Sequence, residues 1–312
     1  MGTVGATCPD TLAWPVSFAA RYGAGKDRAV VFGGGGVYLL AWYVSYLSGL
    51  RKADVDLSNA DLAVGTSAGG QAAAWLAADA IQADATTSAW LPRLAAMGEI
   101  TGATKFPSQL RALNLLAAAE TNDPDVFGPL GRAALAAHAP EASETRRVMR
   151  AVLEMDTFPP AVRMNATDAF TGERLVITAS SGVDIACAAT ASASVPGLFR
   201  PQPVLDRFCV DGCCSGSNAH CDIAGGAGRA LVLALEANEE PDPNRKGSMT
   251  VPPGYIHAEA TRLTDAGTAT LLKGPSSFTT SELMSSSAVA KAWDMAQDQA
   301  KSDADQVRDF WA

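Results

Sequence analysis

Short apolar runs that end in glycine turns organise the first quarter of the chain. Residues 28 to 32 form one such run, and residues 61 to 64 form another. Each run passes through a glycine-containing turn into a stretch whose apolar residues recur at helical spacing. A strand, a tight turn and a helix, repeated in this order, predict an α/β fold with a parallel sheet.

The pattern changes in the middle of the chain. Residues from about 76 to 155 are rich in Ala and Leu and carry few strand signals, and Thr121-Asn122-Asp123-Pro124 is a turn and cap cluster. These features predict a helical insert. The remaining predicted elements are strands at 162–167, 174–178 and 230–235 and a helical tail at 282–312.

The stretch from Ala29 to Leu50 carries no charge and is long enough to suggest a membrane span. Four consecutive glycines, Gly33 to Gly36, would break a spanning helix. A buried strand that turns into a buried helix explains the same residues better. We interpret residues 1–27 as an N-terminal leader without a targeting signal, since Asp10 and Pro15 interrupt it.

Composition narrows the functional classes. The chain is 48% hydrophobic and 18% charged, as expected of a globular protein. A net charge of −9 repels phosphate backbones, so we exclude nucleic acid as a partner. The six cysteines do not form the framework of a small secreted domain, which favours reduced thiols in the cytoplasm. The sequence leaves peripheral contact with membranes and the oligomeric state open.

Gly65-Thr66-Ser67-Ala68-Gly69 is a G-x-S-x-G motif between a predicted strand and a predicted helix. A nucleophile on such a turn needs small neighbours, and the first helical turn then supplies amide groups for a developing oxyanion. A glycine-bounded turn with a capping serine explains the motif about equally well when it is taken alone.

Gly33-Gly34-Gly35-Gly36 lies between the first predicted strand and its helix. Glycines let backbone amides approach a substrate oxygen, so the run suits an oxyanion hole or the pyrophosphate of a dinucleotide. The dinucleotide fingerprint G-x-G-x-x-G fails, because its sixth position is Tyr38 or Leu39.

A nucleophilic serine needs a base, and the three histidines, His138, His220 and His257, lie in no motif that suggests catalysis. Asp211 precedes Gly212, which taken alone is a common turn.

Together, the glycine run, the G-x-S-x-G motif and the downstream Asp-Gly resemble the patatin-like phospholipases. Gly33 to Val37 followed by Ala41-Trp42 is similar to the actinobacterial branch of that family. The resemblance covers roughly residues 28 to 235, and its other matching segments are Asn165-Ala166-Thr167-Asp168 with Thr171-Gly172-Glu173, Ala191 to Phe199, Val210-Asp211-Gly212 and Ser217-Asn218-Ala219.

The resemblance implies a three-layer sandwich with a mainly parallel central sheet, formed by one acyl hydrolase domain at 28–312. It also implies a Ser67–Asp211 dyad, an oxyanion hole at Gly34, Gly35 and Gly36, no cofactor or metal, and a lipid or other ester as substrate. Tyr38 and Leu39 stand where the family often has a basic residue and glycine, and Cys213 stands where Gly or Ala is usual.

Other functions remain open at this stage. An α/β-hydrolase esterase would combine Ser67 with an acid and His257. A binding or scaffold protein would keep the fold without activity, and a nicotinamide-dependent reductase would rest on the glycine run alone. A zinc site at Cys209, Cys213, Cys214, His220 and Cys221 lacks the usual paired ligand spacing.

Overall fold

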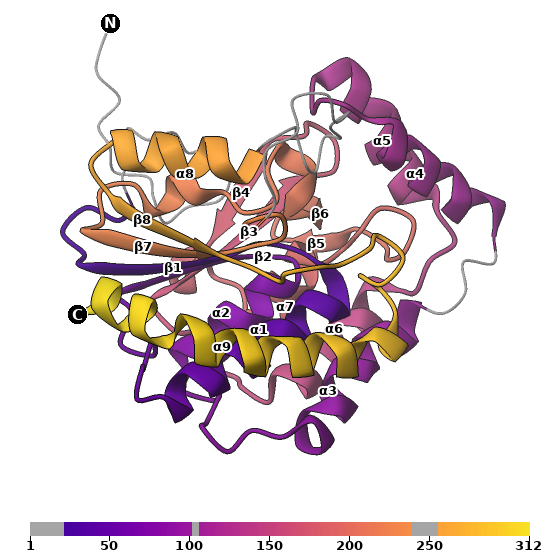
Figure 1. The fold of residues 1–312 in the computed structure, drawn as a ribbon. Helices are drawn as coiled ribbons and strands as arrows, with labels where there is room; N and C mark the ends of the chain where they lie inside the picture. The colour runs from indigo at the N-terminus through magenta and orange to yellow at the C-terminus, as the bar shows by residue number, and fades with distance from the viewer. Residues whose placement is uncertain (1–21, 102–105, 239–254) are drawn as a thin grey trace, which may run out of the picture.

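The computed structural model describes residues 22–101, 106–238 and 255–312, so most of the predicted leader lies outside the described residues. Within this part, an eight-stranded sheet lies between layers of helices (Figure 1). The strands are β1 (Arg28–Phe32), β2 (Leu62–Thr66), β3 (Val162–Asp168), β4 (Arg174–Ile177), β5 (Gln202–Val204), β6 (Arg207–Asp211), β7 (Arg229–Leu233) and β8 (Ala269–Lys273). The helices are α1 (Gly36–Lys52), α2 (Ala68–Ala77), α3 (Thr87–Thr101), α4 (Pro107–Ala118), α5 (Pro124–Ala136), α6 (Ala142–Leu153), α7 (Ile185–Ser192), α8 (Tyr255–Asp265) and α9 (Val289–Trp311).

The sheet is mixed but mainly parallel, as the sequence predicts. Its strand order is β5-β6-β3-β2-β1-β7-β8, with β4 paired to β3. Strands β1, β2, β3, β7 and β8 are parallel, whereas β4 and β6 run antiparallel to β3. The central strands are buried on both faces, which explains their continuous apolar sequences.

Helices cover both faces of the sheet (Figure 1). Helices α1, α2, α7 and α9 cover one face, and α8 covers the other. The segment between α2 and β3 holds the four helices α3 to α6, in the region of the predicted insert. Of these, α4 and α5 pack together at one end of the molecule.

Helix α1 is buried around its whole circumference because it packs between the sheet and α9 (Figure 1). The absence of a side chain at Gly49 lets α9 approach closely, since a Cβ there would lie 2.6 Å from the Cβ of Ala300. The apolar stretch from Ala29 to Leu50 is therefore β1 and most of α1, in the protein core. Among the described residues, no helix is long and apolar enough to cross a membrane.

Candidate active site

Ser67 lies on the sharp turn between β2 and α2. Its backbone has φ 55° and ψ −123°, a left-handed conformation that a non-glycine residue adopts only under constraint. The flanking glycines make this turn possible: a Cβ on Gly65 would lie 2.3 Å from the Gly69 carbonyl oxygen, and one on Gly69 would lie 2.2 Å from that of Phe32. The Ser192 hydroxyl accepts a hydrogen bond from the Ser67 amide at 2.8 Å and holds the turn in place.

The sheet brings Ser67 and Asp211 together along one edge of β3. Strand β2 pairs with the first half of β3 and ends with Thr66 opposite Asn165. Strand β6 approaches from the other direction, pairs with the second half of β3 and ends with Asp211 opposite Ala166. Because β4 occupies the other edge of β3, β2 and β6 meet end to end. The residues that follow β2 and end β6 are therefore neighbours.

The Asp211 carboxyl group is fully buried. Its Oδ1 accepts a hydrogen bond from the Cys213 amide at 3.0 Å, whereas Oδ2 is buried without a partner that meets hydrogen-bond geometry among the described residues. Burial raises the pKa of Asp211 from 3.8 to about 6, although the Cys213 amide and the nearby Ser67 hydroxyl favour the charged form. This carboxyl group is thus a stronger proton acceptor than an exposed aspartate.

The glycine run forms the loop between β1 and α1, beside Ser67. The Gly34 amide donates to the backbone oxygen and to Oδ1 of Asn218, both at 3.0 Å, and the Asn218 side chain donates back to the Gly34 oxygen at 2.8 Å. Gly34 is thereby fixed, and its N–H group points at Asn218. Gly35 and Gly36 begin α1, where amides carry partial positive charge.

These residues line one cavity of about 330 Å³. Its wall includes Ser67, Asp211 and all three of Gly34, Gly35 and Gly36. Most of the remaining wall is apolar, and it is formed by Val37, Leu40, Leu116, Ala193, Val195, Leu198, Phe199, Leu235, Leu283 and Met284. The arrangement combines a constrained serine, a buried carboxyl group and an amide-rich loop at the end of an apolar space.

The sequence profile of the Patatin family, described as patatin-like phospholipase, matches residues 30–224. This match covers more than half of the chain and includes Ser67, Asp211 and the glycine run. The chain belongs to the patatin-like phospholipase family. The three-layer fold predicted from the resemblance is confirmed.

One solved structure similar to this patatin-like chain is that of the type III effector protein ExoU. The two share 19% sequence identity with a TM-score of 0.28, and the match covers 88% of this chain and 53% of the other. The chain thus spans about half the length of that protein. The curated proteins contain no sequence that matches this chain.

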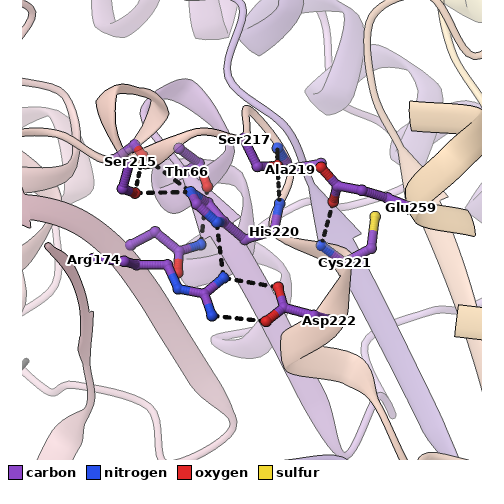
Figure 2. Close-up of polar contacts among 11 residues, drawn as sticks. Thr66, Arg174, Ser215, Ser217, Ala219, His220, Cys221, Asp222 and Glu259 are labelled. Atoms are coloured by element: carbon purple, nitrogen blue, oxygen red, sulfur yellow. Dashed lines mark hydrogen bonds and ion pairs between the residues drawn. The ribbon is translucent and has the colours of Figure 1, made fainter. Parts of the chain in front are cut away.

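A polar cluster around His220 contacts Gly212, the residue that follows Asp211. Figure 2 shows its Arg174, His220 and Asp222 side chains. Arg174 forms two hydrogen bonds of 2.7 Å with Asp222 and donates to His220 Nδ1 at 2.9 Å. Since Nδ1 accepts, Nε2 carries the proton and donates to the Gly212 oxygen at 2.9 Å. Burial, together with the charge of Arg174, lowers the pKa of His220 to about 3, so this histidine is neutral and fixes the Gly212 peptide.

Glu259 of α8 holds both ends of the loop from Ser217 to Cys221 (Figure 2). One carboxylate oxygen accepts from the Ser217 hydroxyl, and the other accepts from the Cys221 amide at 2.8 Å. Ser217 in turn accepts from the amides of Ala219 and His220. Glu259 therefore acts on the glycine loop through Asn218. No local motif indicates a role for Ser192 or Asn218, although both lie in segments that carry the family resemblance.

We expect the Arg174–Asp222 pair to stabilise the fold. Asp222→Ala should lower the free energy of unfolding by about 3 kcal/mol, because the largely buried Arg174 loses its bidentate partner. Asp305→Ala removes an exposed ion pair with Arg308 and should change the free energy of unfolding by less than about 1 kcal/mol. Denaturant unfolding of both variants measures the difference. Equal effects would contradict the role given to the buried pair.

The three histidines considered from sequence lie away from the cavity wall. His257 Nε2 contacts the Glu236 carbonyl oxygen at 3.2 Å, His138 packs on Phe106, and His220 faces Arg174. All three histidines lie in the described part of the chain, and none lines the cavity. Within that part, no cluster of His, Cys, Asp and Glu side chains is arranged to hold a metal ion.

Proposed function

We propose that this protein is a lipid acyl hydrolase that cleaves carboxylic esters through a Ser67–Asp211 dyad. The observation that supports this most is the shared cavity, where a constrained serine and a fully buried carboxyl group open onto one apolar space. A hydrolase of this kind needs a nucleophile, a base within reach and a dry site for the ester.

In the proposed mechanism, the Ser67 hydroxyl attacks the ester carbonyl while Asp211 accepts its proton. The proton then passes from Asp211 to the leaving alcohol, and an acyl-enzyme remains on Ser67. Asp211 next accepts a proton from the water that attacks the acyl-enzyme, and it returns this proton to the Ser67 oxygen as the acid is released. No histidine takes part in either half of the reaction.

We assign the oxyanion to the amides of Gly35 and Gly36. Gly35 is the N-cap of α1 and Gly36 is its first residue, and the described residues include no hydrogen-bond partner for either amide. The helix terminus adds favourable electrostatic potential at this point. Gly34 contributes differently, because its bonds to Asn218 fix the course of the loop.

The apolar side chains of the cavity wall indicate the class of substrate. Leucine, valine and phenylalanine side chains surround the space beyond Ser67, which suits the acyl chain of a lipid ester. Phospholipids and neutral glycerolipids both present such a chain. We propose a lipid or smaller acyl ester as the substrate, with peripheral membrane contact and a cytoplasmic location as predictions from the sequence.

The test is chemical labelling of the wild-type protein. A fluorophosphonate probe should attach to the peptide that contains Ser67, as read by mass spectrometry, and the protein should release p-nitrophenol from p-nitrophenyl hexanoate. Phosphatidylcholine vesicles and tributyrin emulsions then compare lipid classes by fatty acid release. A protein that neither labels nor turns over any of these esters would contradict the proposal and favour a non-catalytic binding role.

The activity should depend on pH through Asp211. The base must be charged to accept a proton, and its pKa is raised to about 6 by burial. We therefore expect kcat/KM to rise with pH, to reach half its maximum near pH 6 and to level off above pH 7. Stopped assays between pH 4.5 and 8 measure the profile. A midpoint near pH 4 would mean that an exposed carboxylate is the base.

A further inference from the structure

Gln71 is a buried polar residue in the wall of the cavity. It is 3% exposed and belongs to α2, four residues after Ser67. Helical side chains lean toward the N-terminus of their helix, and Ser67 directly precedes the N-terminus of α2. The Gln71 side chain therefore leans toward the end of the helix at which the nucleophile lies, and Ser67, Ala68 and Gln71 all line the same space.

The described part of the fold provides no hydrogen-bond partner for the oxygen of the Gln71 carboxamide. Its Oε1 is buried without a hydrogen-bond partner among the described residues. Leaving such a group unsatisfied is unfavourable, and a leucine of similar size would avoid the penalty in this apolar wall. The other polar side chains deep in the cavity have roles, since Asn218 is bonded to Gly34 and Ser67 and Asp211 form the proposed dyad.

We propose that Gln71 forms a subsite that hydrogen-bonds a hydroxyl group on the acyl chain of the substrate. A hydroxyl group both donates and accepts, so it satisfies the carboxamide in either orientation of its oxygen and nitrogen atoms. The acyl side is favoured because the leaving alcohol must lie beside Asp211, which protonates it, whereas Gln71 belongs to α2. The inference rests on the proposed function and narrows its substrate to hydroxylated acyl esters.

The test compares p-nitrophenyl hexanoate with the 2-, 3- and 6-hydroxyhexanoate esters. We expect the wild-type protein to prefer at least one hydroxy ester over the plain ester. In the Gln71→Leu variant, the ratio of kcat/KM for that hydroxy ester to kcat/KM for the plain ester should fall by about tenfold. Turnover of the plain ester should be retained or increased, which also verifies folding. Gln71→Met is a second apolar variant of similar size and should behave in the same way.

Gln82→Leu is the matched control, because it makes the same change of side chain at an exposed position outside the cavity wall. This variant should leave the ratios within threefold of the wild-type values. Ratios that stay within threefold in both Gln71 variants, for all three hydroxy esters, would overturn the subsite while the hydrolase proposal stands. A wild-type protein inert toward all four esters would overturn both.

Discussion

Ser67→Ala should abolish ester hydrolysis and fluorophosphonate labelling. The hydroxyl group supplies the bond to the acyl group, and the described residues include no other serine so constrained beside a buried carboxyl group. Removing a nucleophile of this kind typically lowers kcat by about 10⁴ or more. Turnover of p-nitrophenyl hexanoate over several hours measures the residual rate.

Ser48→Ala is the matched control for this loss. Ser48 is fully buried, whereas Ser67 is partly exposed, and Ser48 lies near the far end of α1, where it donates to the Ala83 carbonyl oxygen. Its substitution should leave labelling and kcat/KM within about threefold of wild type. The Ser67→Ala variant should keep the wild-type circular dichroism spectrum, because the Ser67 hydroxyl does not hold the turn. Full activity in Ser67→Ala would mean that another group attacks the ester.

The fold was predictable where burial dictates the sequence pattern. Strands β1, β2 and β7 are buried on both faces, so their apolar runs stand out between glycines. Strands β5, β6 and β8 escaped prediction: β5 has three residues, β6 begins with the polar Arg207, and β8 is largely half-exposed. Helix α9 begins at Val289, seven residues after the predicted start, because the chain first turns at Leu283, whose carbonyl oxygen accepts from the Tyr38 amide of α1, and then forms a 3-10 helix at Ser286–Ala288.

The site was predictable where steric demands act on neighbouring residues. Residues 65 and 69 must be glycines, because a Cβ atom at either position would lie within 2.3 Å of a carbonyl oxygen. This requirement appears in the sequence as the G-x-S-x-G motif. Contacts between distant residues leave no such pattern. The bonds between Gly34 and Asn218 join residues 184 apart, and nothing near either one indicates its partner. Gln71 is likewise unremarkable in sequence, since only the cavity shows that its carboxamide is unpaired.

Asp211→Asn should lower kcat by about 10²–10⁴, the usual contribution of a positioned base. An amide has the shape of the carboxyl group but accepts no proton from Ser67, so labelling by the fluorophosphonate should slow by a similar factor. The pH dependence near 6 should disappear from the residual rate, because its source is the raised pKa of Asp211. A residual rate that still titrates near pH 6 would assign that pKa to another group.

The same substitution should stabilise the fold at neutral pH, which separates loss of chemistry from loss of structure. Burial raises the Asp211 pKa from 3.8 to about 6, so the charged carboxylate disfavours the folded state by about 3 kcal/mol above pH 6. Below pH 3.8 both states are protonated and this penalty vanishes. Asp211→Asn should therefore unfold at higher denaturant concentration than wild type at pH 8, with the difference shrinking between pH 6 and pH 4. If Asp211→Asn were less stable than wild type at pH 8, the buried charge of Asp211 would not destabilise the fold, and this interpretation would be contradicted.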